Sequence, residues 1–440
     1  MSSLLIKNGR ILTLNQSNEV IDCGSVYIEG ALIKEVGTFP DDQYAADRTI
    51  DAQGRVVMPG FINTHHHLYS SFARGFAAPG KPAGNFKEIL ESLWWKLDRA
   101  LNEKDVYYSA LLALMESIRS GCTTIVDHHA SPSCRDGSLD IIEQAFREAG
   151  LNGCLCYEVS DRNRPGEGIE ENARFIHKCL KYGDDQIAAL FGLHAAMTLG
   201  PETLERCAGI GKETATGFHV HAAEDLIDEE VCAGKFGKTV MDRFHDAGIT
   251  GPNSIFVHGV HLSDHELDIL GGTHSILVHN PESNMNNAVG VTRILDMLER
   301  EILVGLGTDG MASHMISSAR AAYLLQRHFH HDPRVGFLEA AGMLLKNNRA
   351  ICQRIFREPR GEMSPGYLAD VIVADYIPTT PLQSNTLAGH VLFGLNYAPV
   401  RTTICRGKLL MEDGKLLTLN EEEICARSRE RAEKLWSRVK

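Results

Sequence analysis

The sequence predicts an α/β protein: a (β/α)8 TIM-like barrel joined to a small β-sandwich domain built from both ends of the chain. Strand and helix patterns alternate eight times between about residue 57 and residue 310, the number of units that closes a parallel barrel. Short strand patterns separated by turn residues fill the first part of the chain and return near its end. Polar residues suited to metal binding or proton transfer follow most of the central strands.

Each end of the chain supplies part of the expected sandwich. Near the N-terminus, Asn8-Gly9 separates two apolar runs, which is typical of a hairpin, but this region is short of strands. The missing strands follow the central body, at Ala369–Asp375, Val400–Cys405 and Lys408–Met411. We therefore expect residues 1–56 and 368–440 to form one sandwich, with the barrel inserted between them as residues 57–367. Apolar residues at helical spacing predict a terminal helix from Glu421 to Lys440.

The central body alternates between strands and helices. The first strand contains Val56–Met58 and precedes the histidines at 65–67; the others are Cys122–His129, Asn152–Val159, Ile187–His194, Gly217–His221, Ser254–His258, Ser275–His279 and Leu303–Asp309. Apolar residues recur along one face between Lys104 and Ser120, which predicts a helix that Gly121 ends. Further helices are expected at Asp140–Gly150, Ile169–Tyr182, Pro201–Ala215, within the 230s and 240s, and at Ser263–Leu270 and Val291–Arg300.

Composition narrows the class of protein. The chain has 440 residues, 43% of them hydrophobic, which is enough to bury a large core. A formal net charge of -13, without a long basic run, argues against a nucleic-acid partner and against attachment to acidic lipid. We find neither a secretory signal nor an apolar stretch long enough to span a membrane. Eleven scattered cysteines without a C-x-x-C motif favour reduced thiols in the cytoplasm.

The residues with metal or acid–base chemistry lie at the ends of the central strands. His65 and His67 are two residues apart, so the alternation of a strand places both imidazoles on one face. Other strands end in or near Asp127, His128, His129, His194, His221, Glu224, His258, His279 and Asp309. In a parallel barrel these ends meet at one rim, where active sites form. Imidazoles and carboxylates gathered there suit a first-row divalent metal ion.

Four motifs resemble the amidohydrolase superfamily, in particular its cytosine/guanine deaminase and chlorohydrolase branch. They are Pro59-Gly60-Phe61-Ile62-Asn63-Thr64-His65-His66-His67, His219-Val220-His221-Ala222-Ala223-Glu224, Val257-His258-Gly259-Val260-His261 and Leu306-Gly307-Thr308-Asp309-Gly310. Trp94-Trp95-Lys96-Leu97-Asp98 and Ser283-Asn284-Met285-Asn286-Asn287 add to the similarity. The resemblance extends over essentially the whole chain, including the split sandwich.

The resemblance implies one metal site. His65, His67, His221 and Asp309 would hold a single divalent ion, zinc in the first place, with iron or manganese as alternatives that spacing does not separate. The metal would lower the pKa of a bound water, so that hydroxide exists near neutral pH. Relatives with two metals use a modified lysine at the end of the fourth strand; His194 stands there, which favours one metal.

The resemblance also implies catalytic roles. Glu224 would carry a proton from the water to the leaving nitrogen, and Asp309 would help to take that proton. His258 would hydrogen-bond the attacking water or the developing oxygen, and His194 would contact a carbonyl or ring nitrogen of the substrate. Because period-two alternation does not place His221 and Glu224 on one face, we expect the chain to leave the strand between them.

These roles predict a metal-dependent hydrolase that attacks a carbon–nitrogen bond of a small nitrogen heterocycle through a metal-bound hydroxide, as a deaminase does. Opening of a cyclic amide in purine or pyrimidine breakdown, dehalogenation of a chlorinated ring and an inactive scaffold are the alternatives. Deaminases of this branch carry a proline and an aromatic residue around the fourth-strand histidine; Leu193 and Ala195 flank His194, which argues against nucleoside or adenine-like substrates. The branch often assembles, so we expect a homo-oligomer, a dimer or larger.

Several further residues carry weaker expectations. Five other histidines are expected to be structural or to orient the metal ligands: His128, His129, His219, His261 and His279. Trp94 and Trp95 are expected in the core, and Arg162 and Arg164 in solvent.

Overall fold

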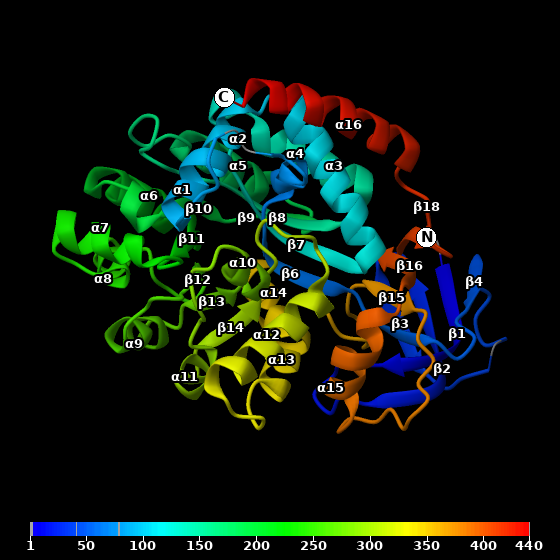
Figure 1. Ribbon diagram of the computed structural model, residues 1–440. Coiled ribbons are helices and arrows are strands. Elements are labelled where there is room, and N and C mark those ends of the chain that lie inside the picture. The colour runs from blue at the N-terminus through cyan, green and yellow to red at the C-terminus, as the bar shows by residue number, and fades with distance from the viewer. Residues whose placement is uncertain (1–2, 41, 78–79, 440) are drawn as a thin grey trace.

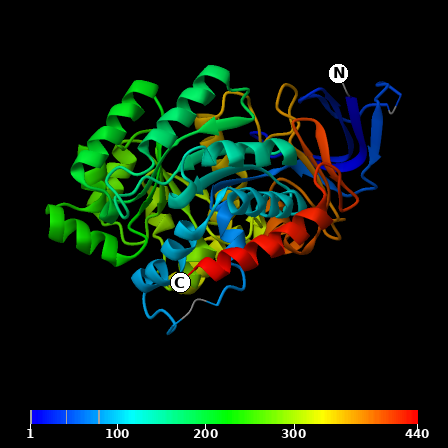
Figure 2. The ribbon, with the colours of Figure 1, turned by 90° about the horizontal axis from the view of Figure 1, so that it is seen from above.

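The computed structural model of the chain describes residues 3–40, 42–77 and 80–439. Lys440, the expected end of the last helix, lies outside these residues. One sheet is built from both chain ends, and two parallel sheets occupy the centre (Figure 1). Seen from above in Figure 2, the sheet formed by the chain ends lies to one side of the helical body. The α/β class with parallel central strands is confirmed.

The sheet from the chain ends has nine strands, which we call the terminal sheet. Its halves join where β15 (Val371–Ala374) runs antiparallel to β5 (Val56–Pro59), with Val373 opposite Val57. Its other strands are β1 (Ser3–Leu12), β2 (Val20–Glu29), β3 (Leu32–Gly37), β4 (Arg48–Asp51), β16 (Val400–Cys405), β17 (Lys408–Glu412) and β18 (Lys415–Leu416). The two ends of the chain therefore form one sheet together, as predicted from the shortage of strands near the N-terminus.

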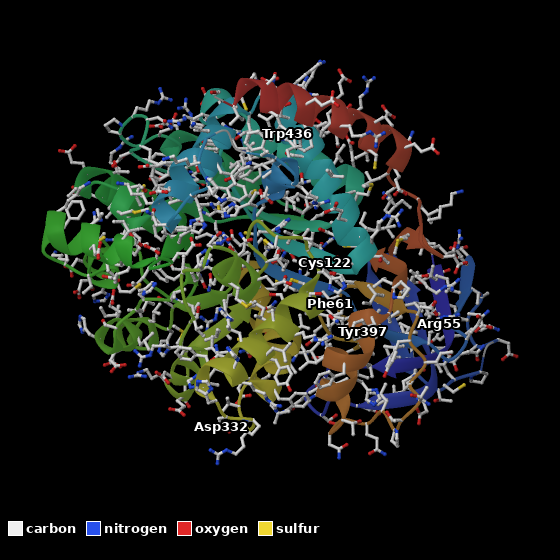
Figure 3. The ribbon with its side chains drawn as sticks, viewed as in Figure 1. Arg55, Phe61, Cys122, Asp332, Tyr397 and Trp436 are labelled. Atoms are coloured by element: carbon white, nitrogen blue, oxygen red, sulfur yellow. The ribbon has the colours of Figure 1, made fainter. Side chains whose placement is uncertain are left out.

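The apolar run Val56–Met58 was expected to belong to the first strand of the central body. It lies instead in the terminal sheet. Strand β5 pairs with β1 and β15, and the first central strand is β6 (Phe61–His66). Gly60 separates β5 from β6, and a Cβ atom on it would lie 2.3 Å from Cγ2 of Thr123. Only glycine fits where the chain passes from one sheet to the next. Figure 3 shows Phe61 and its register partner Cys122 near this boundary.

The central strands run parallel in two sheets. One contains β6, β7 (Cys122–His129), β8 (Asn152–Tyr157) and β9 (Ile187–Ala189), and the other β10 (Phe191–Ala195), β11 (Phe218–Ala222), β12 (Ile255–His258), β13 (Ile276–His279) and β14 (Leu303–Leu306). The fourth expected strand is thus divided at Leu190, because β9 pairs with β8 whereas β10 pairs with β11. Single parallel bridges, His66 with Asp309 and Val159 with Leu193, link the two sheets. Within the described residues the ladders do not form one continuous closed barrel.

Helices cover the outside of the central strands. Helix α3 (Glu103–Ser120) begins at an Asn102–Asp105 capping box and ends at Gly121, whose φ of 76° is left-handed. The others are α1 (Phe86–Ile89), α2 (Trp95–Ala100), α4 (Ser138–Ala149), α5 (Ile169–Tyr182), α6 (Pro201–Thr214), α7 (Leu226–Phe236), α8 (Val240–Asp246), α9 (Asp264–Gly272), α10 (Pro281–Asn286), α11 (Ile294–Glu299), α12 (Met315–His330), α13 (Phe337–Gly342), α14 (Asn348–Ile355), α15 (Leu387–Gly389) and α16 (Glu421–Arg438). None of the described helices is long and apolar enough to cross a membrane.

Helix α16 returns from the terminal sheet across α3, along the top of Figure 1. Its Arg431 binds the buried Asp105 carboxylate at 2.8 Å, and Arg438 binds the other oxygen. The indole N–H of Trp436, labelled in Figure 3, donates to the Phe72 carbonyl at 2.7 Å. Phe72 lies five residues after His67, so the C-terminal helix supports the loop that leaves the histidine motif.

Candidate active site

Four side chains from three strand ends converge on one point. His65 and His67 come from the end of β6, His221 from β11 and Asp309 from the turn after β14. Nε2 of His67 lies 3.0 Å from Oδ1 of Asp309 and 3.2 Å from Nε2 of His221, and Nε2 of His65 lies 3.4 Å from the same carboxylate oxygen. All four donor atoms lie within 4.8 Å of one another. The four residues that the sequence singles out are therefore brought together.

The hydrogen bonds behind these imidazoles decide which nitrogen faces the centre. Nδ1 of His67 donates to the His128 carbonyl at 2.6 Å, and Nδ1 of His221 donates to the His194 carbonyl at 2.8 Å. Both Nε2 atoms therefore present lone pairs. Nε2 of His65 is buried without a hydrogen-bond partner, so its lone pair is available to a cation. Three imidazole nitrogens and one carboxylate oxygen fit a first-row divalent cation.

The electrostatics of the four residues also suit a cation. Burial lowers the pKa of His221 to about 3 and that of His65 well below its usual value, so both imidazoles are neutral. Burial would raise the pKa of Asp309, but the nearby imidazoles of His65 and His67 hold it well below its usual value. Burial opposes a charge on His67 too, yet Asp309 raises its pKa to about 9. A bound cation would take the place of that proton.

Glu224 and His258 face the same centre. The chain leaves β11 after Ala222, and Ala223 has a φ of 46°, which turns Glu224 inward as expected. Oε2 of Glu224 lies 3.4 Å from Nε2 of His258, and both side chains have donor atoms within 4.8 Å of Asp309. Burial, followed by the charge of Asp309, raises the pKa of Glu224 well above its usual value. A carboxyl group of raised pKa is suited to taking and returning a proton.

Helix α10 and the residue after it hold the side chains of Glu224, His258 and Asp309, a role that the sequence did not reveal. Its Asn284 accepts from Nδ1 of His258 at 2.7 Å, so Nε2 of His258 is left as an acceptor. Ser283 donates to Asp309, and Asn287, just after the helix, donates to Glu224 at 3.1 Å. The only signal in the sequence was a cluster of amide and hydroxyl side chains directly after the seventh strand.

A cavity of about 870 Å³, including the solvent at its mouth, opens beside His67, His221 and Asp309. His194 lines it, as expected of a substrate contact. Trp94 and Trp95 line it as well, which corrects their expected place in the core: the helical segment that bears them stands at the mouth, and the Trp95 ring lies 6.2 Å from that of His194. Arg162, expected in solvent, is buried against the Trp95 ring, whereas Arg164 is exposed as expected.

The five histidines expected to be structural or to orient the metal ligands lie behind the site or beside it, and all but His261 are buried. Nδ1 of His65 lies 2.9 Å from Nε2 of His219, and Nε2 of His128 lies 3.0 Å from the Leu193 carbonyl. His129 is bonded to Ser131 and His261 to the Val289 carbonyl, while both ring nitrogens of His279 are buried without a partner. Four acidic residues of the cavity were missed: Asp98, Glu158, Asp225 and Asp228. Glu158 directly follows β8, so the rule applied to the other strand ends could have found it.

Three imidazoles and a carboxylate suited to a cation, the Glu224 carboxyl and an open cavity share one rim, and together they define a metal-dependent hydrolase of carbon–nitrogen bonds. The amidohydrolase family model matches residues 56–410. The chain belongs to this family.

Relatives and solved structures agree with this assignment. The chain is 31% identical over 438 residues to a 5-methylthioadenosine/S-adenosylhomocysteine deaminase of Syntrophomonas wolfei, covering 98% of this chain and 99% of the relative. It is 30% identical over 446 residues to a 5'-deoxyadenosine deaminase of Methanosarcina barkeri, covering 100% of both. A zinc-bound adenosine deaminase from Xanthomonas campestris has the same fold, with a TM-score of 0.83 at 20% identity, covering 99% of each chain. An atrazine chlorohydrolase from Arthrobacter aurescens complexed with zinc gives 0.82 at 19%, covering 98% of this chain and 100% of the other.

Proposed function

We propose that this protein is a deaminase that hydrolyses the bond between a ring carbon and its exocyclic amino group in an aminated purine or related heterocycle. The supporting observation is the set of His65, His67, His221 and Asp309 around one point, with Glu224 beside it. The names of the relatives at 30 and 31% identity favour an adenine-derived ring, against the expectation drawn from the missing aromatic residue near His194. Such an exocyclic amine is carried on an amidine-type carbon, which water can attack.

His65, His67, His221 and Asp309 would hold one divalent ion, zinc in the first place. When bound, the metal supplies Lewis acidity that makes a water molecule acidic near neutral pH. Iron and manganese suit the same donors, so the metal of the purified protein has to be measured.

The chain's own groups then move the protons. Glu224 accepts a proton from the attacking water and delivers it to the exocyclic nitrogen, so that a carbon–oxygen bond forms, the carbon–nitrogen bond breaks and ammonia leaves. Nε2 of His258, left as an acceptor by Asn284, orients the water. Asp309 assists in the proton transfer, and His194 binds a ring nitrogen or carbonyl from the cavity wall. Trp94 and Trp95 shield the site from bulk water.

Finer features of the architecture belong to the proposal. The two parallel sheets, linked by single bridges, would act as one (β/α)8 barrel spanning residues 57–367. The terminal sheet, residues 1–56 with 368–440, would close on its own apolar cluster as a sandwich. We place the protein in the cytoplasm as a homo-oligomer, a dimer or larger, without a nucleic-acid or membrane partner. The free state of all eleven cysteines agrees with a reducing compartment.

The test is turnover of a panel of heterocycles by metal-loaded protein, with Glu224→Gln as the matched inactive control. Ammonia release without a ring-opened product supports deamination. A new carboxylate without ammonia would instead identify a ring-opening hydrolase, and halide release a dehalogenase. Protein that binds no metal and turns over none of the panel would contradict an enzymatic role.

A further inference from the structure

The cavity is lined by acids. Six carboxylates face it, and among the described residues no lysine or arginine does: Asp98, Glu158, Glu224, Asp225, Asp228 and Asp309. Four of these have assigned partners or roles. Glu224 and Asp309 face the metal centre, Asp228 accepts two backbone N–H groups, and Asp225 caps α7. The other two, Asp98 and Glu158, share a wall of the cavity that the reaction does not use.

A single guanidinium serves both of these acids. Arg162 donates to Oδ2 of Asp98 at 3.2 Å from two of its nitrogens and to Oε1 of Glu158 from one. Its charge lies 5.0 Å from the centroid of the Trp95 ring, and its side chain is only 12% exposed. Each carboxylate therefore keeps one oxygen free of Arg162, and Oδ1 of Asp98 is buried without any partner. Burial raises the pKa of Asp98 to about 7, and Arg162 is bonded to both acids, so this wall offers no unpaired cation.

The free oxygen of Glu158 faces a second acceptor. Nε2 of His128 lies 3.0 and 3.2 Å from the Leu193 and His219 carbonyls, so this nitrogen carries the proton and Nδ1 carries a lone pair. That Nδ1 is fully buried, has no hydrogen-bond partner and lies 3.7 Å from Oε2 of Glu158. Two acceptors thus face each other, and a hydrogen-bond donor is what the position lacks. A ring nitrogen of His221 lies within 4.8 Å of a ring nitrogen of His128 and of a carboxylate oxygen of Glu158. This position therefore adjoins the proposed metal centre.

We propose that Glu158 is a specificity-determining residue whose free oxygen accepts a hydrogen bond from an N–H or ammonium group of the substrate. A charge-assisted bond of this kind favours amino-heterocycles that carry a second donor or a positive charge. A carboxylate or phosphate on the substrate would lose its hydration without meeting an unpaired cation on this wall, because Arg162 is already bound to Asp98 and Glu158, so such compounds are rejected. The inference rests on the proposed function, because it names the substrate class of the same cavity.

The experiment measures binding and turnover separately, with two sets of adenines. One set carries hydrogen, an amino group or a carboxylate at C2, and the other carries propyl, 2-aminoethyl or 2-carboxyethyl at N9. Dissociation constants are measured on metal-loaded Glu224→Gln protein with or without Glu158→Gln, and ammonia release on proteins that retain Glu224. Glu167→Gln is the matched control, since Glu167 lies on the same connection but does not line the cavity.

In at least one set, the amino compound is expected to bind about tenfold more tightly than the neutral one and the carboxylate more weakly. Glu158→Gln should remove most of this difference by weakening the amino compound and strengthening the carboxylate, while Glu167→Gln leaves the order unchanged. Equal affinity for amino and carboxylate compounds in both sets, or an order that Glu158→Gln does not alter, would overturn the inference. If the order holds without ammonia release from any compound, the proposed deamination fails while the role of Glu158 stands.

Discussion

Asn287 donates a hydrogen bond from Nδ2 to Oε1 of Glu224 over 3.1 Å, and so fixes the carboxylate proposed to move the protons. Its bond lowers the pKa of Glu224, against burial and the charge of Asp309, both of which raise it. Asn287, directly after helix α10, therefore lowers the pKa of Glu224 as well as orienting its carboxylate.

Replacing Asn287 by leucine should shift the pH profile. Without the donor the pKa of Glu224 rises, so a larger fraction of the carboxyl is protonated and unable to accept a proton from water. We expect the acidic limb of the kcat/KM profile to move to higher pH, with about a tenfold loss on that limb and a smaller loss above it. Met285 is exposed on helix α10 and does not line the cavity, and Met285→Leu should leave the limb in place. An unmoved limb in Asn287→Leu would contradict the tuning role.

His219 should govern metal affinity without being a ligand. Its Nε2 lies 2.9 Å from Nδ1 of His65 and accounts for the orientation of that ring. His219→Phe should weaken metal binding by about 10- to 100-fold, measured by competition with a chelator. His129→Phe is the control, because His129 is equally buried but bonds to Ser131 instead of a ligand. If the metal affinity of His219→Phe equals that of the wild type, the hydrogen bond from His219 is not needed to orient His65.

The C-terminal helix should contribute to stability through Asp105. This carboxylate is fully buried, and Arg431 and Arg438 of α16 supply its charge partners. Arg431→Ala should reduce the free energy of unfolding by about 1–3 kcal/mol, because a buried carboxylate loses one of its donors. The exposed Lys434 on the same helix pairs only with Glu430, so Lys434→Ala should change the Tm little. Equal Tm values for the two variants would argue against the role of Asp105.

Stability should fall as the pH rises because of a carboxyl pair away from the active site. Burial, followed by the Glu266 carboxyl, raises the pKa of Glu229 from 4.5 to about 9. The folded protein therefore holds a proton that the unfolded chain releases, and stability is lost progressively from about pH 4.5 towards pH 9. Near pH 9, Glu229→Gln should be more stable than the wild type by on the order of 1 kcal/mol. The effect is this small because the Glu229 side chain is partly exposed and solvent screens its charge. The exposed Glu230 provides the control variant, Glu230→Gln, and identical Tm–pH curves for all three proteins would refute the effect.

The gathering of His65, His67, His221 and Asp309 at one point could be predicted because its signals are local. The spacing of His65 and His67 fixes a shared face, and the ends of parallel strands converge whatever the details of packing. His221 and Asp309 follow from the same rule. Helix α16 and the joining of the two chain ends could also be predicted from short patterns. The helix follows from the helical spacing of apolar residues near the C-terminus, and the joining from the shortage of strands near the N-terminus.

Other features depend on how distant segments pack, and the sequence could not disclose them. Val56–Met58 is as apolar as a central strand, and only its pairing with β1 and β15 places it in the terminal sheet. The division of the fourth strand at Leu190 likewise reflects a change of partner from β8 to β11, since the residues on both sides of it have strand character. The contacts of Asn287 and Glu158 arise from loops meeting over the cavity, which no periodicity encodes.

The central claim is that three imidazoles and one carboxylate share a single cation. Anomalous diffraction from crystals of the purified protein, recorded on both sides of the zinc absorption edge, tests it most directly. We expect one peak about 2.0–2.2 Å from Nε2 of His65, His67 and His221 and from a carboxylate oxygen of Asp309. A peak at the iron or manganese edge in the same place would change only the metal, whereas an ion bound elsewhere, or none in metal-supplemented crystals, would contradict the account.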